Sequence, residues 1–510
     1  MSAEPRGVVV SEYDYIVVGG GSAGCVLAAR LSEDPSARVL LLEAGSRTLP
    51  DLSAVPAAWP ALMQTPQNWG DTSVRMEHTG TSVMQPRGRG LGGSSAMNGM
   101  IFLRAHRSSY DAWAEGGLKG WGYDDLLPYF KRTETARRGD AAVRGQDGPM
   151  RVGPAAHVHP LMRAAGEAAV EAGHPRTVDF ADGQEDGVGL FDVNIVDGMR
   201  QSAADAYVLP VVDRANLEVV TDALVRRLRF DGDRCVGVEY TAGHETTLAD
   251  ASREVVLTAG TMGSAQLLML SGIGPAGHLR EIGVDVLVDA PEVGSNYHDH
   301  PTTTLTYSAS LEVPGTSGNH AEVGVRIRST PDVEAPDVQL ILSEAPLAPG
   351  VEYGHGYSFL VALMTPRSRG TVRLSGPSVE APLILDPNCY ADLRDEQAMV
   401  SALRLARQIG QAPALAPWRG QEILPGLRET DEELAEYART SVVVYWHPVG
   451  TCRMGVDDSS VVDEELRVRG VAGVRIADAS VMPSIVAANT NATVLAIAER
   501  ASDLIKNSNR

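Results

Sequence analysis

The chain has 510 residues, a formal net charge of −21 at pH 7 and 44% hydrophobic residues. This length exceeds the size at which one hydrophobic core keeps growing, so we expect at least two domains. The acidic balance argues against a nucleic-acid partner, because affinity for a phosphate backbone comes largely from basic side chains. Four scattered cysteines without C-x-x-C spacing predict reduced thiols rather than a disulfide framework or a zinc site.

The N-terminal region lacks an apolar run followed by a cleavage site, and no later segment is long and apolar enough to span a bilayer. The sequence therefore predicts a cytoplasmic protein without a transmembrane segment. It shows no internal repeat and no low-complexity tract.

The first predicted strand, 15–18, runs into a glycine turn over 19–24 with the sequence GGGSAG. A helical pattern over 25–36 and a buried strand over 38–43 follow, and that strand ends in Glu43. This order of strand, glycine turn, helix, strand and acid is typical of dinucleotide binding. The glycines let the backbone approach a pyrophosphate at the helix N-terminus, and Glu43 can accept a ribose hydroxyl.

The same turn also fits G-x-S-x-G, the nucleophile elbow of hydrolases, with Ser22 as the nucleophile and His447 as the late histidine. Against this alternative, only one strand precedes the turn, whereas a hydrolase elbow follows most of its sheet and needs an earlier oxyanion-hole loop. The order of the elements therefore favours cofactor binding.

Residues 46–87 are rich in proline and polar residues with little periodicity, which predicts a long functional loop or lid that contains Trp69. The segment 87–99 is dense in glycine, so we expect its backbone to pass very close to another group. Residues 217–259 predict short strands that form a β-meander returning to the main sheet. A second glycine turn at 260–264 then opens a helix whose N-terminus suits a phosphate.

From 302 to 444 the sequence changes to separated strands followed by helices near 392–412 and 430–440, which predicts an α+β substrate domain. The expected strands there are 302–309, 321–329, 337–342, 357–364 and 370–374. The last section returns to a buried strand over 473–478 and a helix over 491–505.

His298, Asp299 and His300 form an alternating cluster that could place two histidines on one strand face as metal ligands. No third ligand is evident, so we interpret the cluster as a polar hinge at a domain boundary and expect no metal site. Cys452 has no neighbouring group that would activate a nucleophile, so we expect a buried structural thiol.

Three separated motifs together resemble the glucose–methanol–choline (GMC) oxidoreductase family of flavoproteins, in its bacterial choline dehydrogenase and oxidase branch. They are the N-terminal turn with Glu43, the segment 88–98 continuing to Ala105 and Asp111, and the segment 260–275. Ala265, in the third motif, departs from the usual Pro or Ser. Segments 447–451, 477–480 and 489–491 complete the resemblance, which spans residues 12 to 505.

The resemblance implies an α/β FAD-binding domain of the glutathione-reductase-like Rossmann type beside an α+β substrate domain with a six-stranded antiparallel sheet. Residues 1–156, 197–301 and 445–510 would form the discontinuous FAD-binding domain, and 157–196 and 302–444 the substrate-binding domain. The implied cofactor is FAD, and the residues expected to bind it are Gly19, Gly21, Ser22, Ala23, Gly24, Glu43, Ala44, Trp69, Arg89, Leu91, Gly92, Gly93, Ser94, Asn98, Gly99, Met100, Ile101, Val225, Gly260, Asp478, Ala479, Asn489, Thr490 and Asn491.

In this family the substrate alcohol gives its hydroxyl proton to a base and its carbon-bound hydrogen, as hydride, to flavin N5. His447 matches the catalytic histidine, and imidazole suits that role because its unperturbed pKa lies near neutrality. Asn489 matches the second catalytic position; an amide cannot be the base, so we expect it to orient the substrate oxygen. Asn491 is expected to contact the flavin, with capping of its own helix as the alternative.

Met97 occupies the place where some choline oxidases carry a histidine covalently attached to FAD, so we expect a non-covalently held flavin. Thr302 and Ile341 also depart from the choline-enzyme pattern, although Tyr445 and Trp446 still offer an aromatic wall for a cation. We predict oxidation of a primary or secondary alcohol to an aldehyde or ketone, with oxygen or another electron acceptor. The alternatives are a hydroxynitrile-lyase-like enzyme with a non-redox flavin and a non-catalytic flavin-binding protein.

Overall fold

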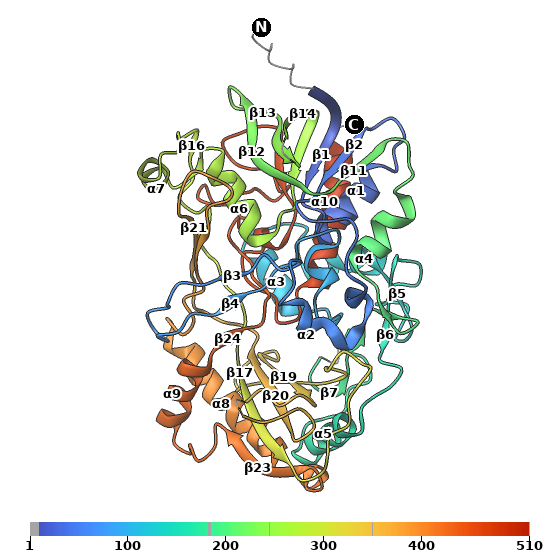
Figure 1. The fold of residues 1–510 in the computed structure, drawn as a ribbon, viewed down its shortest axis with the longest axis vertical. Helices are drawn as coiled ribbons and strands as arrows, with labels where there is room; N and C mark the ends of the chain where they lie inside the picture. The colour runs from blue at the N-terminus through green and yellow to red at the C-terminus, as the bar shows by residue number, and fades with distance from the viewer. Residues whose placement is uncertain (1–9, 182–184, 244, 349, 509–510) are drawn as a thin grey trace.

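A computed structural model describes residues 10–181, 185–243, 245–348 and 350–508. The molecule is longer than it is wide, with a mixed sheet at one end and an antiparallel sheet at the other (Figure 1). Both ends of the described chain lie beside the mixed sheet. Buried apolar side chains form two main clusters, one around each sheet.

The mixed sheet has the strand order β11 (Leu217–Val220), β2 (Val39–Leu42), β1 (Val10–Val18), β14 (Glu245–Leu257), β13 (Arg234–Ala242) and β12 (Ala223–Asp231), with β25 (Val474–Ile476) also pairing with β14. Strands β11, β2, β1, β14 and β25 run parallel to their neighbours in this group. All four residues of β2 are buried, as expected of a parallel strand covered on both faces.

The predicted meander is wrong in one element, because β11 pairs with β2 and only β12, β13 and β14 form consecutive antiparallel neighbours. The backbone of β11 pairs with β2 in parallel, with Leu217 opposite Val39. Asp222, with a left-handed φ of 54°, then redirects the chain into β12.

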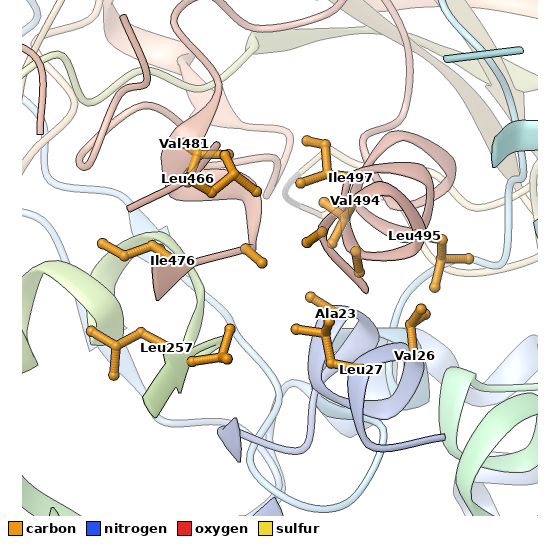
Figure 2. Close-up of a cluster of buried hydrophobic side chains, with 14 of the residues drawn as sticks. Ala23, Val26, Leu27, Leu257, Leu466, Ile476, Val481, Val494, Leu495 and Ile497 are labelled. Atoms are coloured by element: carbon orange, nitrogen blue, oxygen red, sulfur yellow. The ribbon is translucent and has the colours of Figure 1, made fainter. Parts of the chain in front are cut away.

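Helix α1 (Ser22–Leu31) begins inside the glycine turn, earlier than predicted, and packs against the C-terminal helix α10 (Asn491–Ser508). Figure 2 shows Ala23, Val26 and Leu27 of α1 facing Val494, Leu495 and Ile497 of α10, beside Leu257, Leu466, Ile476 and Val481. Gly24 lets α1 lie directly against the glycine turn, since a Cβ there would lie 1.8 Å from the carbonyl oxygen of Gly19. The glycine turn therefore provides the surface against which the start of α1 packs.

The antiparallel sheet has the order β23 (Arg419–Leu424), β17 (Pro301–Ala309), β20 (Gly356–Leu363), β19 (Val338–Ser343), β18 (Val323–Ile327) and β7 (Gly187–Leu190). The number of six matches what the resemblance implied, although β7 and β23 were not among the strands expected from the sequence, and the two-residue strand β24 (Val443–Val444) adds a seventh beside β17. Helices α5 (Pro160–Glu171), α8 (Leu393–Gly410) and α9 (Asp431–Ser441) share the apolar core of this sheet.

One strand expected with this sheet lies elsewhere. Strand β21 (Thr371–Leu374) pairs with β22 (Leu383–Asp386) as a separate hairpin. Val372 of that hairpin packs with Met262 and Tyr297, so the hairpin adheres to α6 (Gly260–Leu270) of the other layer. For β21, apolar contact with α6 is therefore favoured over pairing with an edge strand of the antiparallel sheet.

The predicted long loop over 46–87 contains the short helix α2 (Trp59–Leu62) and the strand pair β3 (Asp71–Thr72) and β4 (Met84–Gln85). The remaining elements are α3 (Arg107–Glu115), α4 (Tyr123–Thr133), α7 (Ala276–Glu281), β5 (Glu134–Ala136), β6 (Met150–Pro154), β8 (Asp192–Val193), β9 (Ile195–Val196), β10 (Met199–Arg200), β15 (Ile273–Gly274) and β16 (Val288–Asp289). Across the described ranges, the helices are all too short or too polar to cross a membrane.

Candidate active site

A cavity of about 710 Å³ extends from the glycine turn to His447. Its first end lies at the carboxyl ends of β1 and β2, where open parallel sheets bind ligands. Ser22, Gly260 and Asn491 begin helices α1, α6 and α10, and all three residues line the cavity. Three helix N-termini therefore favour negative charge there.

Most of the residues predicted to bind the cofactor line this cavity. They are Gly19, Gly21, Ser22, Ala23, Glu43, Ala44, Trp69, Gly93, Ser94, Asn98, Gly99, Met100, Ile101, Val225, Gly260, Asp478, Ala479, Asn489, Thr490 and Asn491. Met97 and Ile341 line it too.

Four predicted residues lie behind the cavity wall. Gly24 brings α1 against the turn, and Leu91 is buried in the main apolar cluster. The N–H of Gly92 donates to the carbonyl of Gly20 at 2.7 Å. Arg89 is exposed, with its guanidinium 5.1 Å from the centre of the Trp69 ring. These four residues contact other parts of the protein and are not part of the cavity lining.

The close backbone approach predicted for the glycine-dense segment is made to the first glycine turn. A Cβ on Gly93 would lie 2.7 Å from the Cα of Gly21, and Gly93 has a left-handed φ of 53°. A Cβ on Gly21 itself would meet no atom of the described chain closer than the Cα of Gly93, at 3.9 Å. A side chain at position 21 would therefore occupy space in the cavity without clashing with the surrounding protein.

The Glu43 carboxylate accepts backbone hydrogen bonds from three glycine-containing segments. Its Oε2 accepts the N–H of Gly20 at 2.8 Å, and its Oε1 accepts those of Gly45 at 2.8 Å and Gly90 at 2.9 Å. Burial raises the pKa of Glu43, while the N–H donors oppose that shift. Because each carboxylate oxygen accepts about two hydrogen bonds, Oε2 keeps one position for the predicted ribose hydroxyl.

Asn491 provides a test of whether the cavity suits a polar, anionic cofactor. Its Oδ1 accepts the hydroxyl hydrogen of Ser22 at 2.7 Å, and its Nδ2 is buried without a partner in the described structure. Buried donors are normally satisfied, so this one is suited to a ligand acceptor. Ser22 bonds to Asn491 rather than to His447, and the nucleophile–base pair that a hydrolase needs is not formed.

His447 lies between two side chains at the other end of the cavity. Its Nδ1 is 3.0 Å from Nδ1 of His300, and its Nε2 is 3.3 Å from Nδ2 of Asn489. Burial lowers the pKa of His447 to about 3. The ring borders the cavity and is neutral at pH 7, the state that a base requires.

A buried glutamine that sequence reasoning missed orients Asn489. Nε2 of Gln339, on β19, donates to Oδ1 of Asn489 at 3.1 Å and to the Tyr445 hydroxyl at 2.9 Å. The amide nitrogen of Asn489 consequently faces His447. The one available signal was a polar residue inside the apolar run of 337–342.

The side chains of His298 and Asp299 bond to backbone groups of the protein. Asp299 Oδ1 accepts the backbone N–H groups of His300 at 2.7 Å and His447 at 2.9 Å, and burial raises the pKa of Asp299 to about 7. The His298 ring contacts the carbonyl of Asn296 at 2.6 Å and the N–H of Ile485 at 2.8 Å. Within the ranges that the structure describes, no cluster of three such side chains has a metal-binding arrangement.

The cavity wall beyond His447 is largely apolar and aromatic. Its residues are Trp59, Pro60, Met63, Ala321, Ile341, Ala345, Leu347, Tyr353, Leu360, Tyr445 and Trp446, with the polar His320 and Ser343. The rings of Trp59 and Trp446 meet edge to face at 5.8 Å. Thr302 is not in this lining; its hydroxyl donates to the carbonyl of His300 at 3.3 Å.

Two ionisable side chains of this wall, His320 and Tyr353, share a carboxylate partner, Glu344. Nδ1 of His320 bonds to the buried Glu344, and its Nε2 lies 2.8 Å from the carbonyl of Ala57. Burial alone would lower the pKa of His320, but the hydrogen bond to Glu344 and its charge raise it overall. The pair joins the 46–87 segment to the antiparallel sheet.

Comparisons with known proteins agree with this architecture. Two sequence models of the GMC oxidoreductase family match residues 13–302 and 366–498. The mitochondrial choline dehydrogenase of Homo sapiens is 38% identical, over 97% of this chain and 90% of its own. Alcohol dehydrogenase (acceptor) of Pseudomonas putida is 37% identical, over 97% of this chain and 95% of its own.

Among solved structures, pyridoxine 4-oxidase from Mesorbium loti superimposes with a TM-score of 0.93 and 38% identity, covering 96% of this chain and 98% of that one. These three relatives are dehydrogenases or oxidases by name, and none of them supports the hydroxynitrile-lyase alternative. The chain therefore belongs to the GMC oxidoreductase family and is an FAD-dependent oxidoreductase that acts on alcohols.

Proposed function

We propose that this protein oxidises an uncharged, apolar or aromatic alcohol at the His447 end of the cavity. His447 is the base and Asn489 orients the alcohol oxygen. The observation that carries the proposal is the placement of His447, which borders the cavity with its Nε2 3.3 Å from the amide nitrogen of Asn489. The lowered pKa of the ring keeps it neutral, as a base requires.

The glycine end of the cavity would hold FAD. The N-termini of α1, α6 and α10 favour its diphosphate, Glu43 has an acceptor position for a ribose hydroxyl, and Asn491 offers an unpaired donor. When bound, the flavin takes up the hydride that leaves the alcohol carbon. Met97 carries no nucleophilic nitrogen, which supports a non-covalently held cofactor.

The spacing of His447 and Asn489 suits one alcohol oxygen. Because Nε2 and Nδ2 are 3.3 Å apart, the alcohol can donate its O–H to His447 while its oxygen accepts the N–H of Asn489. The proton then passes to Nε2, and the amide stabilises the negative charge that develops on the oxygen. The hydrogen bond from Gln339 to Oδ1 of Asn489 keeps Nδ2 of Asn489 oriented toward the alcohol oxygen.

The substrate class follows from the wall beyond His447. Among the described residues, no aspartate or glutamate lines this end of the cavity, so a quaternary ammonium group would lack a counter-charge. The apolar and aromatic lining instead favours a hydrocarbon or aryl group. We therefore infer that choline, named in the human relative, is a poor substrate of this protein.

Two further proposals concern organisation and compartment. The separate apolar clusters around the two sheets support the domain division predicted from the sequence. The four cysteines are buried and unpaired, which supports the predicted cytoplasmic location.

Anaerobic mixing of the FAD-loaded protein with an alcohol panel tests the function. We expect flavin bleaching with benzyl and medium-chain primary alcohols, and faster bleaching with 3,3-dimethylbutan-1-ol than with choline, its cationic isostere. Air and an artificial quinone, added afterwards, identify the electron acceptor. A preference for choline would overturn the substrate class, and cleavage of a cyanohydrin without bleaching by any alcohol would overturn the reaction.

A further inference from the structure

We propose that His300 is a positioning residue that fixes the single ring proton of His447 on Nδ1. Nε2 is thereby left without a hydrogen; it accepts an N–H of Asn489 in the described structure, and the O–H of a bound alcohol would take that place. The inference rests on the proposed function, in which His447 is the base, and extends it to a residue that the cavity does not expose.

The first step is the protonation of His300 itself. Its Nε2 lies 3.2 Å from the carbonyl oxygen of Val486, which can only accept a hydrogen bond, so Nε2 carries a hydrogen. His300 is completely buried, and burial together with the neighbouring His447 lowers its pKa well below the usual value. A neutral ring with its hydrogen on Nε2 has a bare Nδ1.

The second step determines the tautomer of His447 from that of His300. The two Nδ1 atoms are 3.0 Å apart, and a hydrogen bond between them needs one donor. Since Nδ1 of His300 is bare, Nδ1 of His447 must carry the hydrogen. A neutral His447 then has no hydrogen on Nε2.

The hydrogen bonds on the other side of His447 run in the same direction. Gln339 donates to Oδ1 of Asn489, so Nδ2 of Asn489 is the atom that faces Nε2 of His447, at 3.3 Å. An amide nitrogen can only donate, and it needs a bare Nε2. The hydrogen bonds therefore run in one direction, from Gln339 through Asn489, His447 and His300 to Val486.

The opposite tautomer would break this chain at two places. A hydrogen on Nε2 of His447 would face the N–H of Asn489, and two lone pairs would face each other between the Nδ1 atoms. The fault between the two Nδ1 atoms would lie beside the completely buried His300, which makes the alternative costly.

The His300 ring is also held in place for this task. Asp299 accepts the backbone N–H groups of both His300 and His447, and the two rings meet edge to face at 5.2 Å. When the alcohol proton reaches Nε2, Nδ1–H of His447 still donates to His300, so the imidazolium keeps its partner. No proton moves to His300; the alcohol proton ends on His447.

The test compares three variants by the rate of anaerobic flavin reduction. His300→Leu should reduce it about 100-fold, the scale on which partners of a functional histidine act, with FAD content unchanged. His300→Gln should recover part of the rate, because an amide oxygen can accept from Nδ1. His298→Gln is the control, since that buried ring lies two residues away and bonds to Asn296 and Ile485 instead of His447; its rate should stay close to wild type.

A spectroscopic measurement keeps the inference testable even where a variant fails to fold. The FAD-loaded wild-type protein is labelled with ¹⁵N-histidine, and the His447 signals are assigned by their loss in His447→Asn. We expect a protonated Nδ1 and a bare Nε2. The reverse pattern, or a wild-type reduction rate in His300→Leu, would overturn the proposal. Undiminished turnover by His447→Asn would instead reject His447 as the base and leave the tautomer result standing.

Discussion

The glycine-turn end of the cavity is made mainly of backbone, whereas the His447 end is made of side chains from segments far apart in the chain. At the first end, glycines at 21 and 93 nearly touch, and Glu43 collects the N–H groups of three loops. At the second, His300, His447 and Asn489 meet through ring and amide nitrogens.

This difference in construction predicts how each end of the cavity should respond to substitution. A wall of closely packed backbone has no room for an added atom, so changes there should affect folding and cofactor retention. A row of hydrogen-bonded side chains can lose one member without moving the backbone, so changes there should affect rate. The following predictions test that division.

The largest effect is expected at Gly24. A Cβ there would lie 1.8 Å from the Gly19 carbonyl oxygen, so Gly24→Ala should cost more than about 4 kcal/mol and yield no flavin-loaded protein. Gly21→Ala is the matched control, because its Cβ has no close neighbour in the described chain and points to the cavity. It should fold but bind FAD more weakly, as followed by thermal unfolding and flavin fluorescence. Equal behaviour of the two variants would contradict the distinction.

His447→Ala should slow flavin reduction by about 10³-fold, within the range for loss of a general base, while FAD stays bound. Stopped-flow absorbance measures the rate, and the flavin-to-protein ratio measures retention. Loss of FAD from this variant would show that the two ends of the cavity are not separable.

Asn489→Ala should slow flavin reduction by about 100-fold, the scale for removal of one donor to a developing negative charge. Asn489→Asp keeps the size of the side chain but loses the N–H donor, so it should show at least the same loss. If the aspartate variant retained the wild-type rate, the amide hydrogen would have no role in orienting the alcohol.

The smallest effect is expected from pH. Burial raises the pKa of Asp299 to about 7, so its carboxyl is protonated below that pH and ionised above it. An ionised Asp299 next to His447 favours the imidazolium, so flavin reduction should rise a few-fold as pH increases through 7. Asp299→Asn should remove this inflection and keep the lower rate at every pH.

The other titratable groups around Asp299 should not contribute between pH 5 and 8. Burial lowers the pKa values of His447 and His300 far below this window, and raises those of Tyr297, Cys389 and Tyr445 above it. Burial also raises the pKa of Glu322, beside His320 of the cavity wall, to about 7. The comparison is therefore made in a Glu322→Gln background, where an inflection that survives Asp299→Asn would contradict the assignment.

Much of the cofactor end could be predicted because its signals are local. The order of β1, the glycine turn, α1, β2 and Glu43 occupies one short stretch of sequence, and its steric requirements act between near neighbours. Errors arose where tertiary contacts decided the outcome: β11 joined β2 instead of the meander, and β21 left the antiparallel sheet for α6.

At the reaction end, the sequence indicated His447 and Asn489 only through their resemblance to a family. His300 was noticed for a different reason, as half of a possible metal pair, and Gln339 was not noticed at all. Position 300 is 147 residues from His447, and position 339 is 150 residues from Asn489, so no local pattern links them.

The sequence by itself determined the mixed sheet's central strands and the glycine turn, because each depends on residue type and short-range spacing, whereas His447 was indicated only by the resemblance to the family. Only the tertiary structure decided that Glu43 ties three loops, that Gly93 rests on Gly21, and that the proton of His447 faces His300. Hydrogen-bond direction depends on which donors and acceptors surround a ring in space, and folding alone brings those groups together.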